Sequence, residues 1–468
     1  MVFSSLIFIF MFMPITLLVY YLSPKSLRNF IILVASLIFY GWGEPKYIII
    51  MIFTTIFDYI IGILIQKNNK RKIIKRNLLV FAVIINLGLL GFFKYFGFFI
   101  ENINNIFGLH MEYERLPLPV GISFYTFQTL SYVVDVYLNK VKAQRNIIAF
   151  GAYVTMFPQL VAGPIVKYSD VAKELKIRKE NIDDFSNGIE RFVVGLGKKV
   201  LLANNIALVW TSIKALEINE LSILSAWIGI IAFTFQIYFD FSGYSDMAIG
   251  LGKMFGFHFN ENFNYPYISK SATEFWRRWH ISLGSWFREY IYIPLGGNRK
   301  GLLIQCRNLF IVWFLTGFWH GANWNFIVWG LYFGLIIFLE KLFLGRILDK
   351  LGKTISHIYT MIIVIVGWVF FDFQSIAKGL SYIKVMFGIN GNHIIDSKAM
   401  YYLTTNLILF IILIVCSTPI VKKVYEKLKE NLEEKGQVIL AITNMSILFF
   451  STAYLVNESY NPFLYFRF

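Results

Sequence analysis

The segment Tyr47-Ile-Ile-Ile-Met-Ile-Phe-Thr-Thr-Ile-Phe-Asp-Tyr-Ile-Ile-Gly-Ile-Leu-Ile65 decides the fold class, because an apolar run of this length can cross a membrane. About 20 such residues span the hydrocarbon layer as an α-helix. A strongly basic loop follows, Lys67-Asn-Asn-Lys-Arg-Lys-Ile-Ile-Lys-Arg76. Basic loops between apolar spans face the cytoplasm, so the two segments together predict a membrane helix with a cytoplasmic end.

Apolar blocks recur along the whole chain of 468 residues, which is 57% hydrophobic and only 15% charged. A soluble protein usually carries about 25% charged residues. The blocks lie at about 3–22, 29–41, 47–65, 77–100, 119–138, 146–166, 188–213, 221–257, 302–317, 323–345, 355–373, 400–420 and 436–455. We therefore predict an all-α polytopic membrane protein with about 11 to 13 transmembrane or re-entrant helices. Because no soluble domain or repeat is evident, residues 1–468 are expected to form one integral-membrane domain, with its C-terminal spans at about 355–455.

The formal net charge of +16 raises the question of nucleic-acid binding. The basic residues lie mostly between apolar blocks, whereas a nucleic-acid site gathers them on one face of a soluble domain. This distribution argues against nucleic acid and for membrane lipid as the surrounding partner. Cys306 and Cys416 lie far apart in the sequence and form no metal or disulfide motif, so no metal is expected. Residues 1–24 lack a basic start and a cleavage site, which favours a retained first span over a signal peptide.

Two segments depart from simple membrane helices. The block at 146–166 contains Gly151, Pro158, Gly163 and Pro164. Proline disfavours one uninterrupted helix, so a re-entrant segment beside an internal cavity is expected there. In the segment 272–291, aromatic residues recur every three or four positions with charged residues between them. That spacing predicts one amphipathic helix, which lies either at the membrane surface or against the protein.

Ionisable side chains gather in the region 236–329, although most of the chain avoids them. The three motifs that carry them are Gln236-Ile-Tyr-Phe-Asp-Phe-Ser-Gly-Tyr-Ser-Asp246, Glu274-Phe-Trp-Arg-Arg-Trp-His280 and Thr316-Gly-Phe-Trp-His-Gly-Ala-Asn-Trp-Asn325. An ionisable group inside a membrane is costly, and by default it indicates a functional site. The motifs of soluble hydrolases, zinc proteases and nucleotide-binding proteins are absent from the sequence.

His320 is the first candidate for a catalytic residue. An imidazole titrates near neutral pH, so it can take a proton from a hydroxyl or thiol and return it. Small residues beside His320 would let a substrate approach, and Asn323 or Asn325 could orient the ring or bind a carbonyl group. The structural alternative is that His320 and its neighbouring tryptophans form an aromatic belt at the membrane surface.

His280 and Asp240 are weaker candidates on the same argument. The structural alternative for His280 is an interfacial helix that meets lipid head groups, and His280 lies 40 positions before His320 (320 − 280). The two histidines can share a site only through tertiary packing. Asp240 is expected to pair with Arg277, Arg278 or a histidine, either in a functional site or as a buried structural ion pair.

Long motifs of this chain, in the same order, resemble those of the membrane-bound O-acyltransferase (MBOAT) superfamily. The closest likeness is to its bacterial branch, which serves the O-acetylation of alginate and peptidoglycan. The motifs are Met1-Val-Phe-Ser-Ser5, Phe39-Tyr-Gly-Trp-Gly-Glu-Pro-Lys46, Pro119-Val-Gly-Ile-Ser-Phe-Tyr-Thr-Phe-Gln128, Phe157-Pro-Gln-Leu-Val-Ala-Gly-Pro-Ile165, the region from Tyr238 to Arg299, Trp319-His-Gly321 and Asn461-Pro-Phe-Leu-Tyr-Phe-Arg-Phe468. The resemblance implies membrane helices around a central cavity. It places the family's invariant histidine at His320 and its second important histidine at His280, with Asp240 in a supporting segment.

The same resemblance implies a reaction, location and partners. An acetyl group, with acetyl-CoA as the expected cytoplasmic donor and no tightly bound cofactor, would pass across the bacterial cytoplasmic membrane to a cell-surface or secreted polysaccharide. A separate extracytoplasmic enzyme of the SGNH-hydrolase type and the polysaccharide synthesis or export machinery are the expected partners. Trp319, Trp324 and phenylalanine-rich walls would keep water from the acyl group.

Two other functions compete with acetyl transfer. Within the superfamily, a D-alanyl transferase for teichoic acid is the nearest rival, although the first and last segments favour the acetylation branch. From another class, a transporter of acyl groups or lipids would use an intramembrane acid and broken helices equally well.

Overall fold

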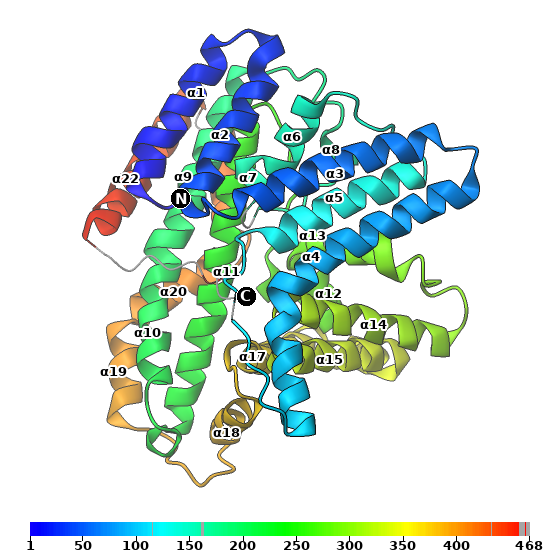
Figure 1. Cartoon of the computed structure of the whole chain (residues 1–468). Helices are drawn as coiled ribbons and strands as arrows, with labels where there is room; N and C mark the ends of the chain where they lie inside the picture. Colours follow the sequence, from blue (N-terminus) through cyan, green and yellow to red (C-terminus); the bar gives the residue numbers. More distant parts are fainter. Residues whose placement is uncertain (115, 161–162, 432, 458–463, 465–468) are drawn as a thin grey trace. The chain divides into compact units, whose positions relative to one another are not determined.

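The computed structural model is built entirely from helices and their connections (Figure 1). It describes residues 1–114, 116–160, 163–431, 433–457 and 464, and these residues include no β-strand. The C-terminal motif at 461–468 therefore lies outside the described residues apart from Leu464, and so do Val161 and Ala162 of an earlier motif. The all-α fold predicted from the apolar blocks is confirmed.

The chain packs into two compact units, each discontinuous in sequence. Unit 1 comprises Met1–Phe192 and Tyr244–Asn260, and unit 2 comprises Val193–Gly243 and Glu261–Phe468. The helices of unit 1 are α1 (Met13–Leu22), α2 (Arg28–Gly43), α3 (Ile48–Lys67), α4 (Lys72–Phe107), α5 (Ile122–Tyr137), α6 (Ile147–Thr155), α7 (Phe157–Leu160), α8 (Tyr168–Val171) and the start of α9 (Ile182–Gly197), with short turns η1 (Phe8–Phe12) and η2 (Lys25–Leu27).

Unit 2 holds the second half of the chain and most of the motif-dense region. Its helices are α10 (Asn204–Lys214), most of α11 (Ile223–Met254), α12 (Ala272–Arg278), α13 (Ile281–Phe287), α14 (Leu302–His320), α15 (Trp324–Leu339), α16 (Gly345–Leu351), α17 (Lys353–Asp372), α18 (Ile376–Met386), α19 (Ser397–Thr405), α20 (Leu407–Cys416), α21 (Ile420–Asn431) and α22 (Glu433–Asn457). Shorter helical turns connect them: η3 (Lys198–Ala203), η4 (Ile218–Glu220), η5 (Pro266–Ile268), η6 (Arg288–Tyr292) and η7 (Glu340–Leu344).

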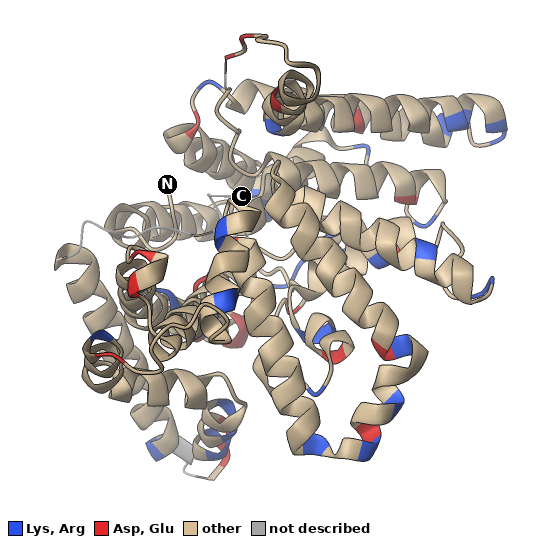
Figure 2. Ribbon diagram, turned by 90° about the horizontal axis from the view of Figure 1, so that it is seen from below, with Lys and Arg blue, Asp and Glu red and all other residues tan. Residues whose placement is uncertain are grey.

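Nine helices of the described chain are long and apolar enough to cross a membrane, or ten if the bent pair α19 and α20 forms one span. Charged side chains cluster mainly near helix ends and connections, and long stretches of ribbon carry none (Figure 2). The remaining predicted blocks, at 3–22, 119–138 and 146–166, form shorter helices. The chain is therefore a multi-pass membrane protein, and the cytoplasmic side of its basic loops stays a prediction.

Unit 1 is held together by aromatic packing and by buried polar contacts. Phe3, near the N-terminus, is fully buried and stacks on Tyr244 with ring centroids 4.4 Å apart. In the adjacent helices α3, α4 and α5 (Figure 1), the amide of Asn86 donates to a carboxylate oxygen of Asp58 at 2.9 Å. The hydroxyl of Thr129 on α5 in turn donates to the Asn86 side-chain oxygen at 3.4 Å. Hydrogen bonds of this kind fix neighbouring helices where lipid offers polar groups no partner.

As predicted, the glycine- and proline-containing block at 146–166 does not form one continuous helix. Helix α6 ends at Thr155, Met156 departs from helical geometry with φ −46° and ψ 107°, and the short helix α7 begins at Phe157. The backbone N–H of Phe157 donates to the hydroxyl of Ser36 on α2 at 3.0 Å. The backbone N–H of Phe157, next to the break, therefore has a hydrogen-bond partner inside the protein. Non-helical backbone in a membrane protein requires such partners.

The segment 272–291 is helical, but the prediction of one continuous amphipathic helix is wrong. Helix α12 ends at Arg278, and α13 begins at Ile281. Between them His280 adopts a left-handed conformation with φ 46° and ψ 53°. The segment therefore consists of two short helices that change direction at His280.

Candidate active site

Helices α14 and α15 of unit 2 form a tight hairpin, and His320 is the last residue of α14. Two glycines let the helix backbones touch. A Cβ atom on Gly317 would lie 2.2 Å from the carbonyl oxygen of Phe326, and one on Gly330 would lie 2.3 Å from that of Trp313. The close packing fixes the end of α14, and His320 is only 6% exposed there. His320 is therefore a buried residue and not part of an exposed aromatic belt.

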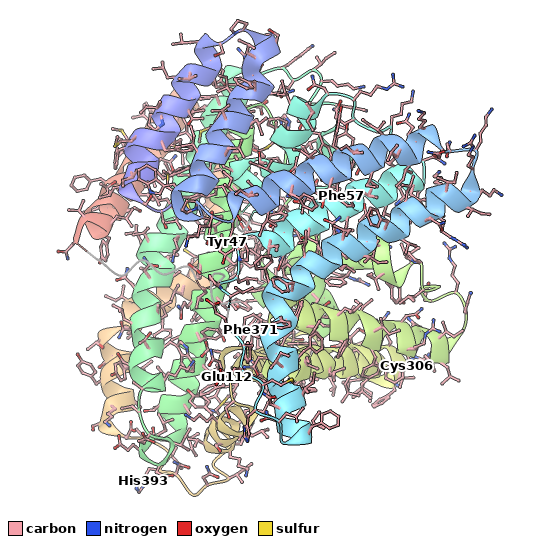
Figure 3. The ribbon with its side chains drawn as sticks, in the orientation of Figure 1. Tyr47, Phe57, Glu112, Cys306, Phe371 and His393 are labelled. Carbon is pink, nitrogen blue, oxygen red and sulfur yellow. The ribbon has the colours of Figure 1, made fainter. Side chains whose placement is uncertain are left out.

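Aromatic rings surround His320 on several sides. The rings of Trp319, Trp329 and Phe371 have centroids 5.0, 5.0 and 5.2 Å from that of His320. Phe371 comes from α17 and is labelled in Figure 3. Apolar walls of this kind exclude water, and electrostatic interactions inside them are strengthened as a result. Trp324, in contrast, is 51% exposed, and its place in the wall stays a prediction.

His280 is buried even more completely, with 3% of its surface exposed. Its Nδ1 atom lies 3.1 Å from the side-chain oxygen of Asn262. The ring of Phe241 stands perpendicular to the imidazole, with centroids 4.7 Å apart. Burial lowers the pKa of His280 from 6.5 to about 3, because the charged imidazolium would lose its hydration. His280 is therefore neutral at physiological pH.

Trp319 connects the two histidines, which lie 40 positions apart in the sequence. Its ring centroid is 6.2 Å from that of His280 and 5.0 Å from that of His320. The predicted convergence of the two histidines through tertiary packing is thus found within unit 2. The two imidazoles therefore pack against one indole ring in the same part of unit 2.

Asp240 takes part in a different cluster. Its carboxylate lies 2.6 Å from the amine of Lys199, and both side chains are almost completely buried. The second carboxylate oxygen accepts a hydrogen bond from the backbone N–H of Leu464 at 2.9 Å. We predicted that Asp240 pairs with Arg277, Arg278 or a histidine. This prediction is wrong, because the ion pair of Asp240 is formed with Lys199. A buried ion pair was the structural alternative considered for Asp240, and the structure contains such a pair with Lys199 as the partner.

The predicted asparagines have separate surroundings. Asn325 is buried, and its amide donates to the backbone oxygens of Phe370 and Phe371 at 3.1 and 3.2 Å. It thereby ties the start of α15 to the end of α17, next to a ring that packs on His320. Asn323 is half-buried at the position before α15.

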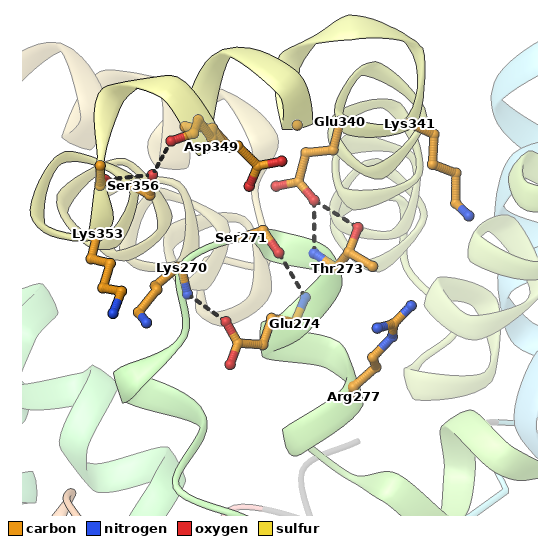
Figure 4. Close-up of a pocket in the computed structure, with 13 residues that line it drawn as sticks. Lys270, Ser271, Thr273, Glu274, Arg277, Glu340, Lys341, Asp349, Lys353 and Ser356 are labelled. Atoms are coloured by element: carbon orange, nitrogen blue, oxygen red, sulfur yellow. Dashed lines mark hydrogen bonds between the residues drawn. The ribbon is translucent and has the colours of Figure 1, made fainter.

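Arg277 lines a polar pocket in unit 2 with a volume of about 730 Å³ (Figure 4). The charged residues of its lining are Lys270, Glu274, Arg277, Glu340, Lys341, Asp349 and Lys353. Glu274 forms an ion pair with Arg278 at 2.9 Å. In the described part of the chain no ion pair involves the four cations of the pocket lining. The lining thus combines four cations with three carboxylates, of which Glu274 and Glu340 have bonding partners of their own.

Glu340 holds the beginning of helix α12, and the sequence analysis missed this role. The carboxylate accepts from the backbone N–H of Ala272 at 2.6 Å. It also accepts from the backbone N–H and the hydroxyl of Thr273 at 2.9 and 2.6 Å (Figure 4). A carboxylate at a helix N-terminus satisfies unpaired N–H groups and complements the helix dipole. The sequence did contain a signal for this role, because Glu340 is an acidic residue near the end of the apolar block at 323–345.

No group of three or more His, Cys, Asp or Glu side chains suited to hold a metal ion occurs among the residues that the structure describes. Asn262, which binds His280, was also missed, although it stands in the sequence stretch Asn262-Phe-Asn-Tyr-Pro-Tyr267 within the motif-dense region.

Comparison with known proteins gives one family and several close relatives. Residues 140–383, which include every predicted site residue, match MBOAT, the membrane-bound O-acyltransferase family. The probable alginate O-acetylase AlgI of Pseudomonas aeruginosa is 41% identical over 83% of this chain and 75% of that protein. The peptidoglycan O-acetyltransferase of Helicobacter pylori is 32% identical over 100% of this chain and 98% of that protein. The teichoic acid D-alanyltransferase of Bacillus subtilis is 27% identical over 47% of this chain and 60% of that protein.

Proposed function

Because this chain belongs to the membrane-bound O-acyltransferase family, it is an acyltransferase, and we propose that it transfers acetyl groups for the O-acetylation of a cell-surface or secreted polysaccharide. The similarity to two O-acetyltransferases covers most of the chain, whereas that to the D-alanyltransferase covers about half. The observation that carries the proposal is that the buried residues His280 and His320 both pack against the ring of Trp319.

His320 is the proposed catalytic residue. As a general base, it takes the proton of an acceptor hydroxyl while the hydroxyl oxygen bonds to the thioester carbonyl carbon. The carbon–sulfur bond then breaks, and the leaving thiolate receives the proton from His320. As a transient acyl carrier, His320 would itself attack the thioester and pass the acetyl group on. The aromatic wall suits both routes, because it keeps water from competing for the acetyl group.

Acetyl-CoA is the proposed donor, and the pocket around Arg277 supports a polyanionic donor of this kind. Lys270, Lys341 and Lys353 accompany Arg277 there without ion pairs in the described structure. Helix α12 leads from this pocket to His280, which is three residues beyond Arg277. Phosphate groups would remain with the cations while the thioester end extends toward the histidines.

The location and partners follow from the same proposal. The enzyme acts in the bacterial cytoplasmic membrane, where the donor is available on the inner side. An extracytoplasmic SGNH-type enzyme completes the transfer to the polymer, together with the polysaccharide synthesis or export machinery.

Replacement of His320 by Ala tests the proposal. We expect ester-linked acetate on the surface polysaccharide to fall by about 100-fold or more, because general acid–base catalysis contributes at least that factor. The His393→Ala variant is the matched control, since His393 is exposed in the loop after α18 (Figure 3) and should leave acetylation unchanged.

The measurement is acetate released by mild base, at equal membrane abundance of each variant. Wild-type acetate with His320→Ala would contradict the catalytic assignment. Loss of released D-alanine in place of acetate would instead assign the chain to the D-alanyl transferases, and loss of neither would leave transport as the function.

A further inference from the structure

Asn262 contacts both sides of the left-handed residue His280. Its side-chain oxygen lies 3.1 Å from Nδ1 of His280 and 2.9 Å from the hydroxyl of Ser282. It also accepts from the backbone N–H of Ser282 at 3.3 Å. The main-chain oxygen of Asn262 accepts from the N–H of Ile281 at 2.9 Å. Asn262 itself is fully buried.

These contacts determine which atom of the Asn262 amide faces the imidazole. The backbone N–H of Ser282 can only donate a hydrogen bond, so the amide atom that it meets is the oxygen. That oxygen can only accept, so Nδ1 of His280 carries a hydrogen. A neutral imidazole has one N–H, and the lone pair is therefore on Nε2.

We propose that Asn262 is a positioning residue for acyl transfer, which holds His280 in the tautomer with hydrogen on Nδ1 and a lone pair on Nε2. His280 can then accept a hydrogen bond through Nε2, but it cannot donate one from that atom to the thioester carbonyl oxygen. This assignment rests on the proposed function. Stabilisation of the developing oxyanion consequently falls to other groups of the site.

The backbone at His280 supports a functional reading of this contact. A non-glycine residue in the left-handed region is strained, and such strain persists where the surrounding structure determines it. Asn262 bonds to His280 through its side chain and to Ile281 through its backbone. The strained corner and the orientation of the ring are therefore fixed by the same residue. Burial keeps the ring neutral, as the lowered pKa of His280 indicates.

The tautomer can be measured without catalysis. We expect ¹⁵N-histidine solid-state NMR of the full-length protein in lipid bilayers to show one neutral imidazole with protonated Nδ1, whose signals disappear in His280→Gln. In Asn262→Ala, the Nδ1–H tautomer should lose its dominance. A His280 ring protonated at Nε2 in the wild-type protein would overturn the proposal. Because this readout needs no turnover, it stays decisive even if the acetyl-transfer function fails.

Kinetics of detergent-solubilised protein with acetyl-CoA provide the second test. We expect Asn262→Ala to lower kcat about 10- to 100-fold with little change in KM, as is typical when the partner of a functional histidine is lost. Asn262→Asp keeps the acceptor oxygen and adds a negative charge that favours imidazolium. Its kcat should therefore exceed that of Asn262→Ala, and the acid limb of its pH–kcat profile should move to higher pH.

Asn308→Ala is the matched control for a purely structural role. Asn308 is also a fully buried asparagine of unit 2, and its amide donates to the carbonyl oxygens of Leu295 and Gly297 at 3.3 and 3.0 Å. We expect it to lower the amount of folded protein while kcat per folded molecule and the pH profile stay at wild type. If Asn262→Ala and Asn262→Asp behave in the same way as this control, Asn262 has no positioning role.

Discussion

At the scale of single residues, the buried pair of Lys199 and Asp240 is a structural contact whose removal should be costly. We expect Lys199→Met or Asp240→Asn to lower the free energy of unfolding by about 3–5 kcal/mol, because either change leaves one buried group without its counter-charge. Thermal unfolding in detergent measures the effect. Lys398→Met is the control, since its pair with Glu220 is about half exposed and should contribute less than about 1 kcal/mol.

The double variant Lys199→Met with Asp240→Asn separates structure from chemistry. It removes both charges, so part of the lost stability should return, and kcat per folded molecule should stay near wild type. A large loss of kcat in the stable double variant would give Asp240 a role in the reaction. The sequence indicated that an ionisable residue at position 240 lies in an apolar region and is costly to bury. Its partner depends on tertiary packing and could not be predicted from the local motif.

At the scale of helices, the hairpin of α14 and α15 depends on backbone contact. We expect Gly330→Ala to lower the free energy of unfolding by about 1–3 kcal/mol, because the added methyl group would force the helices apart beside the carbonyl of Trp313. Acetylation should fall as well, since His320 ends α14. Gly88→Ala on α4 is the matched control, because a methyl group there meets no atom within 4 Å. Equal stability of the two variants would contradict the close-contact interpretation.

Helix positions were predictable wherever the physics is local. A span in lipid must be apolar over its whole length, so the blocks at 47–65 and 323–345 indicated helices directly. The change of direction at His280 was not predictable from the sequence. Aromatic residues every three or four positions in 272–291 fit two short helices joined at a corner as well as they fit one straight helix. The corner is determined by Asn262 and Ile281, whose contact with each other is made only in the folded chain.

At the scale of the whole molecule, the burial of His280 makes stability depend on pH. Its pKa is about 3 in the folded protein and about 6.5 when unfolded, so below pH 6.5 the unfolded chain binds the extra proton. This group therefore destabilises the fold increasingly as the pH falls from 6.5 toward 3, and it has no effect above that window. At pH 5 its contribution should be roughly 2 kcal/mol.

Thermal unfolding of wild type and His280→Gln at pH 7.5 and pH 5 measures this contribution. Acidification should lower the midpoint of the wild-type protein by more than that of His280→Gln, because the variant lacks the titrating ring. Equal shifts in both proteins would show that His280 is not neutral and buried in the folded state.

The bond between Glu340 and helix α12 has a mechanical consequence. Helix α15 starts beside His320 and runs for about 24 Å, at 1.5 Å per residue, to Glu340. Glu340 binds the start of α12, α12 ends at Arg278 two residues before His280, and the Trp319 ring packs against both His280 and His320. Because these contacts form a closed loop, we expect a displacement of α12 at the cationic pocket to move the two imidazoles as well. Ligand occupancy of the pocket is thereby expected to alter the alignment of the reacting groups.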